Sequence, residues 1–325
     1  MSEPILTATS LARHFPVKSR FLGLGTPEVV RAVDGVDLEI GKGETFALVG
    51  ESGCGKSTLG RLLIGLLKPT SGTVRFKGRE LDQIDNRRLR KSVQIIFQDP
   101  LSSLNPRKSI RQIIGRPLAI HGLATDDPEG RIRHILELVQ LDLDTLERYP
   151  HEFSGGQQQR IAIGRALATE PEVLVADEPV SALDVSVQAQ IVTLLNELRQ
   201  KMNLTLVMIA HDLALVNYMA DRTAVMYMGR LVEVGTARQV FTNPRHPYTA
   251  GLLASTGAPD PAARGQRRPV RGEIPSPIHP PSGCRFRTRC PQRMALCEYI
   301  SPELLDVGGE HRVACHLYAE GNIQL

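Results

Sequence analysis

A loop at residues 50 to 58 limits what this chain can fold into, because it follows the pattern G-x-x-x-x-G-K-[ST]. The apolar run at residues 44–49 predicts a buried strand before it. Leucines from Leu59 to Leu67 recur at one-face helical spacing and predict a helix after it. Free N–H groups at the start of that helix favour an anion. The pattern therefore predicts a nucleoside triphosphate site, the alternative being a glycine turn that only joins a strand to a helix.

The residues of this loop have separate predicted roles. Lys56 reaches the β- and γ-phosphates, and the Ser57 hydroxyl is a ligand for Mg²⁺. The glycines let the backbone curve without Cβ clashes, and Cys54 is a small filler. The predicted nucleotide-binding residues of the loop are Gly50, Glu51, Ser52, Gly53, Cys54, Gly55, Lys56, Ser57 and Thr58.

Composition narrows the class of protein. A chain of 325 residues forms one large domain with an appendage, or two domains. Its 39 basic and 35 acidic residues give a net charge of +4, too small to indicate nucleic acid as a partner. No apolar run approaches the roughly 18 residues of a membrane span, and residues 1–9 lack the pattern of a signal peptide. We expect a cytosolic protein that reaches a membrane only through its partners.

Apolar strands alternate with helical patterns along the chain, which predicts an α/β fold with a parallel sheet covered on both faces. The pattern is helical from about residue 105 to 152 and again from 160 to 168. Functional residues of such sheets gather at the carboxyl ends of the strands. The predicted strands cover residues 29–33, 36–40, 44–49, 74–78, 93–97, 173–176 and 204–210.

Polar residues follow several of these strands. Asp177 and Glu178 come after the apolar strand 173–176, where Asp177 is placed to bind Mg²⁺ and Glu178 to activate water. Gln98 and His211 end two further strands. The alternatives are a solvated pair of acids and a structural histidine.

These motifs together resemble the ABC-transporter ATPase family over residues 5–255. The loop at 50–58 matches its Walker A motif, Gln98 its Q-loop, Asp177 and Glu178 its Walker B pair, and His211 its switch. Phe153 replaces the leucine that usually precedes the signature, a change of packing and not of phosphate contacts. The remaining motifs are the signature Ser154, Gly155, Gly156 and Gln157, and the D-loop that ends at Asp184.

The resemblance implies a P-loop (RecA-like) ABC ATPase core with an antiparallel β edge. The core covers residues 1–240, with a helical subdomain at about 100–157. Two such domains pack head to tail, with each ATP held between the Walker A motif of one subunit and the signature of the other. Gln98 also binds Mg²⁺ and, with His211, senses the γ-phosphate. An aromatic residue stacks on adenine, and Phe15 is the candidate.

The segment from Asn243 to Thr249 resembles the one that follows the ATPase domain in dipeptide and oligopeptide importers. We therefore expect an ATPase subunit at the cytoplasmic face of the inner membrane that energises peptide import. Its expected partners are a second ATPase subunit, a paralogue in this subfamily, two transmembrane permeases and an extracytoplasmic solute-binding protein, with no nucleic acid. A nickel chelate or a glycan fragment as solute, a regulatory subunit without catalysis, and a soluble ABC ATPase acting on nucleic acid or ribosomes are the alternatives.

Residues 241–325 form an irregular extension rich in proline and arginine, with cysteines spaced C-x5-C-x6-C-x17-C. Such a segment needs a cross-link, and in the cytosol that indicates metal. The spacing lacks the short pairs of zinc sites, and Cys290-Pro291 resembles ligation of iron–sulfur clusters. Some peptide-importer ATPases carry such a [4Fe–4S] cluster, with zinc and free thiols as the alternatives here. The predicted ligands are Cys284, Cys290, Cys297 and Cys315.

Overall fold

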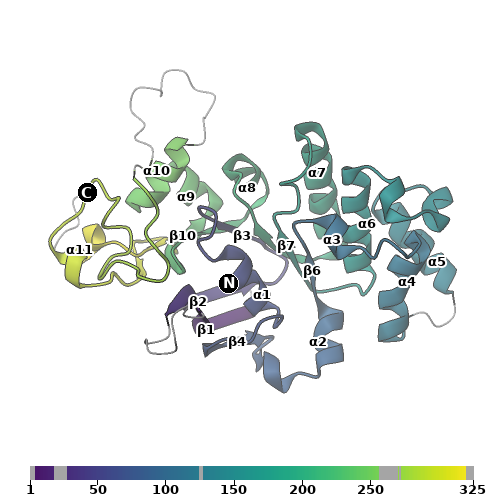
Figure 1. The fold of residues 1–325 in the computed structure, drawn as a ribbon, viewed down its shortest axis with the longest axis horizontal. Coiled ribbons are helices and arrows are strands. Elements are labelled where there is room, and N and C mark those ends of the chain that lie inside the picture. Colours follow the sequence, from purple (N-terminus) through teal and green to yellow (C-terminus); the bar gives the residue numbers. More distant parts are fainter. Residues whose placement is uncertain (1–3, 18–27, 124–126, 256–269, 271, 320–325) are drawn as a thin grey trace, which may run out of the picture. The chain divides into compact units, whose positions relative to one another are not determined.

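The computed structural model describes residues 4–17, 28–123, 127–255, 270 and 272–319 (Figure 1). The described residues group into two compact units. Unit 1 lies within residues 1–4, 41–45 and 79–209, and unit 2 lies within residues 5–40, 46–78 and 210–325.

Unit 1 contains a parallel sheet in the order β8-β7-β6, formed by Thr205–Ile209, Val173–Asp177 and Val93–Ile96. Every residue of β7 and β8 is buried, which confirms the prediction of fully apolar strands. The carboxyl end of β7 therefore places Asp177 at an edge where loops meet.

Helices account for most of the rest of unit 1, and α4, α5 and α6 pack against one another (Figure 1). α6 begins at Gly155, earlier than the helical pattern from residue 160 indicates, because Ser154 caps its first turn. The longest of these helices is α7, with 18 residues. Unit 1 has α2 Asn86–Ser92, α3 Pro100–Ser103, α4 Ile110–His121, α5 Pro128–Leu138, α6 Gly155–Leu167, α7 Val185–Met202, β5 Arg79–Glu80, η1 Leu81–Gln83, η2 Leu143–Glu147 and η3 Pro150–Glu152.

Unit 2 contains a mixed sheet in the order β11-β12-β10-β9-β3, in which β3 pairs with β9 in parallel and the other pairs are antiparallel. A second sheet has the order β2-β1-β4. The sequence patterns did not predict β1, β9 or β10. These strands are β1 Pro4–Pro16, β2 Val29–Gly41, β3 Thr45–Val49, β4 Ser71–Phe76, β9 Arg222–Tyr227, β10 Arg230–Thr236, β11 Leu305–Asp306 and β12 Arg312–Val313.

The helices of unit 2 are short. α1 ends at Leu63, before the last leucines of the predicted helix, since Gly65 takes a left-handed backbone conformation at φ 66°. The helices are α1 Lys56–Leu63, α8 Leu213–Met219, α9 Ala237–Thr242, α10 Pro247–Ser255, α11 Leu296–Tyr299 and η5 His316–Tyr318.

The C-terminal extension packs into unit 2 through buried polar contacts. Glu233 of β10 is fully buried, and its carboxylate accepts hydrogen bonds from the backbone N–H groups of Arg245 and His246 at 2.7 and 2.9 Å. The ring of His311 lies 2.7 Å from the same carboxylate. β12 also extends the sheet at β10. The grouping by contacts places residues 210–325 in one unit. The domain boundary expected at residue 240 therefore stays a prediction.

The arginine Arg285 also anchors the extension. Its guanidinium donates to the carbonyl of Met228 and to the Asp34 carboxylate, which Arg230 contacts as well at 3.3 Å. Burial alone would raise the pKa of Asp34, but Arg285, His14 and Arg230 lower it overall. The extension therefore supplies part of the charge that keeps this carboxylate ionised.

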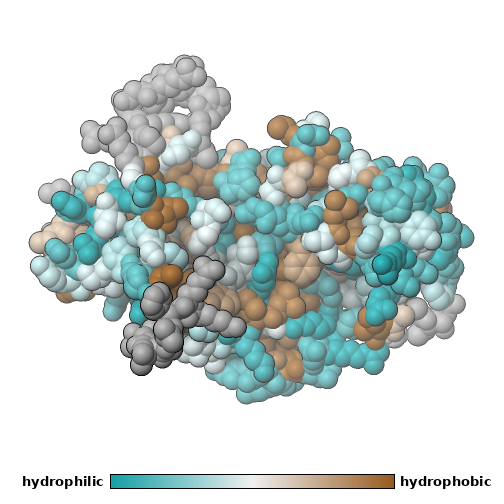
Figure 2. Space-filling model, in the orientation of Figure 1, coloured by the Kyte–Doolittle hydropathy of each residue, from teal (hydrophilic) through white to brown (hydrophobic). Residues whose placement is uncertain are grey.

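The surface is mixed in character. Figure 2 shows several hydrophobic patches separated by hydrophilic areas on the face in view. Among the described residues, no helix is long and apolar enough to cross a membrane.

The buried histidine His246 predicts a pH dependence of stability. Burial lowers its pKa from 6.5 to about 4, so the folded protein binds fewer protons than the unfolded chain below about pH 6.5. We expect the free energy of unfolding to decrease as the pH is lowered. Between pH 7.5 and pH 5, His246 should account for about 2 kcal/mol of that decrease. Urea unfolding of the wild type and of His246→Asn measures it. The difference in stability between the two should shrink by that amount, and a constant difference would contradict the assignment.

Candidate functional site

The predicted phosphate loop has the curvature that its glycines allow. Gly50, Gly53 and Gly55 have φ values of 150°, 76° and 110°. A Cβ on Gly50 would collide with the carbonyl oxygen of Met226, and one on Gly55 would collide with that of Ala32. Glycine is therefore required at both ends of the loop by close backbone contact as well as by conformation.

Lys56 begins α1 and is buried, with 5% of its surface exposed. Its ammonium donates to the carbonyls of Gly50 and Glu51 at 2.8 and 3.0 Å. The charge therefore lies inside the curve of the loop, beside the backbone that a phosphate would approach. Cys54 is buried as predicted, and burial raises the pKa of its thiol.

At the other predicted motifs, unit 1 brings Gln98 and Glu178 together. The Gln98 side-chain amide donates to Glu178 Oε2 at 2.9 Å and lies 3.5 Å from Ser181 Oγ. Ser181 in turn donates to the Glu178 carbonyl at 3.1 Å. Asp177, the last residue of β7, is 2% exposed. A buried carboxylate and a partly exposed one thus stand side by side at the end of one strand.

Glu178 has an uncommon backbone conformation, with φ at 47°. A non-glycine residue in the left-handed region costs free energy, and such residues cluster at functional sites. The N–H of Glu178 donates to the Ile209 carbonyl at 3.0 Å, which helps to hold this turn. The side chain is therefore aimed by its backbone as well as by Gln98.

The predicted signature forms the start of α6. Ser154 and Gln157 form a capping box, in which Ser154 Oγ accepts from the Gln157 N–H at 3.4 Å and Gln157 Oε1 accepts from the Ser154 N–H at 3.0 Å. Ser154, Gly155 and Gln157 are exposed. An exposed helix N-terminus of this length presents N–H groups to an anion.

Phe153, which departs from the family pattern, is buried beneath that turn. The Arg148 guanidinium lies 4.4 Å from the centre of its ring, and the Gln158 amide donates to its carbonyl at 3.0 Å. The phenylalanine thus affects packing below the turn, as the sequence predicted.

Three further residues were predicted to belong to the site. His211 is exposed at the end of the segment after β8, and Asp184 is exposed at the N-terminus of α7. Phe15, the candidate for adenine stacking, is the second-last residue of β1, and the Arg13 guanidinium lies 4.7 Å from the centre of its ring. The rest of the loop that prompted this choice, residues 18–27, lies outside the described residues.

Comparison with known proteins assigns these motifs. Residues 33–181 match the family model described as ABC transporter, and residues 232–297 match the model described as oligopeptide/dipeptide transporter, C-terminal region. The chain is 47% identical to the oligopeptide transport ATP-binding protein AppF of Bacillus subtilis over 98% of both chains. The chain belongs to the ABC transporter ATP-binding proteins of the oligopeptide/dipeptide family. It is also 47% identical to the dipeptide transport ATP-binding protein DppF of Escherichia coli, over 97% of this chain and 95% of that one.

Solved structures support the same ABC ATPase fold. A Clostridium perfringens subunit of the ABC transporter complex cbiONQ is 30% identical, with a TM-score of 0.62 over 74% of this chain and 92% of its own. An ATP-binding cassette solved as a dimer in a post-hydrolysis state with ADP and phosphate is 27% identical, with a TM-score of 0.62 over 72% of this chain and 99% of its own. The chain thus has the fold of an ABC ATPase, and the loop at 50–58 lies within the region that the ABC transporter model matches.

The cysteines of the extension do not form the metal site expected of them. Among the residues that the structure describes, no group of three or more His, Cys, Asp or Glu side chains is placed to hold a metal ion. The four thiols are neighbours nonetheless. Burial, together with the charges of the other cysteines, raises the pKa of Cys284 to about 11 and that of Cys315 to about 12.

Sequence reasoning missed three residues that support the site. Ser181 contacts both Gln98 and the Glu178 backbone. Tyr248 and Arg289 contact Glu51 of the Walker A motif from the extension. Ser181 carried a signal as the first residue of the D-loop motif, and Tyr248 carried one as part of the segment that resembles peptide importers.

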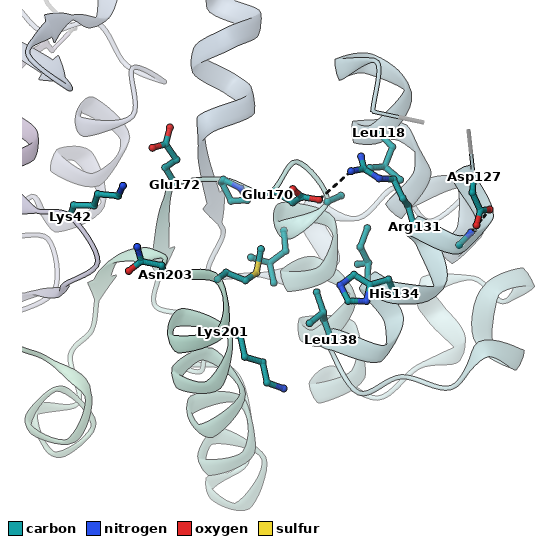
Figure 3. Close-up of a pocket in the computed structure, with 16 residues that line it drawn as sticks. Lys42, Leu118, Asp127, Arg131, His134, Leu138, Glu170, Glu172, Lys201 and Asn203 are labelled. Carbon is teal, nitrogen blue, oxygen red and sulfur yellow. Dashed lines mark hydrogen bonds and ion pairs between the residues drawn. The ribbon is translucent and has the colours of Figure 1, made fainter. Parts of the chain in front are cut away.

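Unit 1 also has a large open cavity of about 920 Å³ (Figure 3). Its lining includes Glu172, directly before β7, and Asn203, two residues before β8, so the cavity lies at the opposite end of these strands from Glu178. Figure 3 shows Arg131 pointing toward Glu170, and these side chains form an ion pair at 3.3 Å. None of the predicted site residues lines this cavity.

The contact between the signature and α7 predicts the effect of Gly156→Ala. A Cβ at this position would collide with Val187 Cγ1, a branched side chain that cannot swing away easily. We expect a loss of about 1–3 kcal/mol in the free energy of unfolding, measured by urea denaturation. Combining it with Val187→Ala should recover part of that loss.

Gly155→Ala is the matched control. Its Cβ would lie 3.3 Å from Leu183 Cδ2, so the loss should be smaller. Equal losses at the two glycines, or no recovery with Val187→Ala, would contradict the steric explanation.

Proposed function

We propose that this chain is the ATP-hydrolysing subunit of an ABC importer for peptides. The main observation behind this proposal is that the N-terminus of α6 is capped and exposed to solvent. Its N–H groups are therefore accessible to the phosphates of a nucleotide that is bound by a second subunit. Similarity to oligopeptide and dipeptide transport ATP-binding proteins along nearly the whole chain supports the choice of peptides as the solute.

In this proposal the Walker A motif binds the phosphates of ATP. Its backbone N–H groups cradle them, and the Lys56 ammonium exchanges the carbonyls of Gly50 and Glu51 for phosphate oxygens. The Ser57 hydroxyl, the Gln98 amide oxygen and the Asp177 carboxylate are oxygen ligands of the kind that Mg²⁺ prefers, so the donor set fits this ion. When bound, Mg²⁺ neutralises charge that develops on the phosphates.

Glu178 is the proposed general base. Its carboxylate accepts a proton from the attacking water, and its direction is set by the Gln98 hydrogen bond and the left-handed backbone. His211, at the end of another strand, contacts the γ-phosphate and reports its presence. Asp184 and the signature complete the site of the partner subunit.

The proposed assembly has two ATPase subunits, a paralogue being the second, together with two permeases and a solute-binding protein. One chain carries one Walker A motif and one signature, so two complete sites need two chains. The permease would dock near Gln98, where Leu101 of α3 is 57% exposed. This arrangement places the subunit at the cytoplasmic face of the inner membrane.

Substituting Glu178 tests the catalytic assignment. Glu178→Gln keeps an acceptor for the Gln98 amide but removes the base. We expect ATP hydrolysis by the assembled transporter to fall at least about a hundredfold while ATP binding is unchanged. Uptake of a labelled peptide into vesicles that contain the complex should fall in parallel.

Glu170→Gln is the control, because Glu170 is an exposed acid in the loop that precedes β7. It should hydrolyse ATP and import peptide like the wild type. If Glu178→Gln still hydrolyses ATP, Glu178 is not the base. If the wild-type complex hydrolyses ATP but does not take up labelled peptide, peptides are not the solute.

We also propose that the four cysteines of the extension bind a [4Fe–4S] cluster, with zinc as the alternative. Four thiols that lie near one another supply the donor set for either. A zinc ion draws its sulfur ligands to within roughly 4 Å of each other, since each Zn–S bond is about 2.3 Å long. The group would cross-link the extension.

Metal analysis of anaerobically purified protein tests this proposal. About four iron and four sulfide per chain, with broad absorption near roughly 400 nm, is the expected result. Cys290→Ser should lower the iron content, whereas Cys54→Ser should not, because Cys54 lies in the Walker A motif. About one zinc per chain would favour the alternative, and neither metal would reject both.

A further inference from the structure

Two residues of the extension, Arg289 and Tyr248, contact Glu51 of the Walker A motif. Arg289 forms a two-point ion pair with its carboxylate, with Nη1–Oε2 and Nη2–Oε1 distances of 2.7 and 2.9 Å. The Arg289 side chain is 5% exposed and that of Glu51 is 24% exposed. A two-point pair of this kind fixes orientation as well as charge.

A second residue of the extension holds the backbone of Glu51. The Tyr248 hydroxyl accepts a hydrogen bond from the Glu51 N–H at 2.9 Å. Burial raises the pKa of Tyr248, so the hydroxyl stays neutral. Tyr248 packs with Tyr227 and Phe286, at ring-centre distances of 4.7 and 5.4 Å. The N–H of Glu51 is therefore fixed by a rigid aromatic cluster.

Fixing Glu51 fixes the loop around it. Its carbonyl accepts from Lys56 Nζ at 3.0 Å and from the Cys54 N–H at 3.3 Å. Glu51 is also the one acidic residue within residues 50–58. A carboxylate without a cation at this position would repel a triphosphate across a short distance. Arg289 removes that repulsion by neutralising it.

The position of Arg289 depends on the cysteine segment. Arg289 directly precedes Cys290, and its N–H donates to the Phe286 carbonyl at 2.9 Å. The Cys284 N–H donates to the Cys297 carbonyl, also at 2.9 Å. Arg289 thus ends a tight turn that starts at one cysteine and stops before the next.

We propose that Arg289 is a positioning residue for nucleotide binding, which makes the ATP affinity of this subunit depend on the fold of the four-cysteine segment. The inference rests on the proposed role of residues 50–58 in binding ATP. In this proposal the extension controls the Walker A motif by neutralising the charge of Glu51.

Titration of the full-length chain with ATP by calorimetry tests this at low and at high salt. Arg289→Gln should weaken ATP binding about tenfold at low salt, and less at about 1 M salt, where charges are screened beyond about 3 Å. Adding Glu51→Gln to it should restore the affinity to within about twofold of Glu51→Gln alone, because the carboxylate is gone. If Arg289 had a purely structural role, the loss of ATP affinity in Arg289→Gln would not depend on salt, and adding Glu51→Gln would not restore the affinity.

Arg287→Gln is the matched control, since Arg287 lies in the same turn and its guanidinium donates to the carbonyl and the hydroxyl of Ser282 at 2.9 and 3.1 Å. It should bind ATP like the wild type. Should Arg289→Gln fail to fold, Arg289→Lys keeps the charge and should show a smaller loss that Glu51→Gln also repairs.

Cys290→Ser tests the link to the cysteines. It should weaken ATP binding with the same salt dependence, and Glu51→Gln should repair it. Unchanged affinity in Cys290→Ser would overturn the link, and unchanged affinity in Arg289→Gln would overturn the inference as a whole. If the wild type binds no ATP, the proposed function itself fails.

Discussion

The closeness of the phosphate loop to two other backbone segments is the constraint on which the site depends. Carbonyls at Met226 and Ala32 lie where a Cβ on Gly50 or Gly55 would be. The curvature of the loop is therefore imposed from outside by β9 and β2, in addition to its own conformational freedom. Glu51 is then held by a tyrosine and an arginine from the far end of the chain. A loop supported in this way needs little rearrangement to receive an anion.

The other half of the chemistry depends on a local arrangement in unit 1. β7 ends in a buried aspartate, and the next residue turns into the left-handed region. Gln98, from the strand that pairs with β7, reaches the glutamate across the strand ends. Parallel pairing is what brings these residues together, because it places the carboxyl ends of neighbouring strands at the same edge.

Much of the site was predictable because its motifs are local. Gly50, Gln98 and Asp177 each follow an apolar strand, and a strand end can be found from a few neighbouring residues. The pair Glu51 and Arg289 was not predictable, since the two residues lie 238 positions apart and no periodic pattern links them. The short strand β12 was missed for a similar reason: two residues of sequence carry no alternation, and its pairing with β10 supplies the order. The early end of α1 follows from one glycine within an otherwise helical pattern.

The buried carboxylate of Glu233 bears on how this protein can evolve. All the hydrogen-bond donors described for it come from residues after 240, namely the backbone of Arg245 and His246 and the ring of His311. An ancestor without the extension would have left a charge in the interior of the sheet with no partner, at a cost of several kcal/mol. Removing the extension from this chain is therefore expected to destabilise the sheet unless Glu233 is replaced as well. The ATPase domain of this family member is not an interchangeable module, because one of its own strands carries a residue that requires the extension.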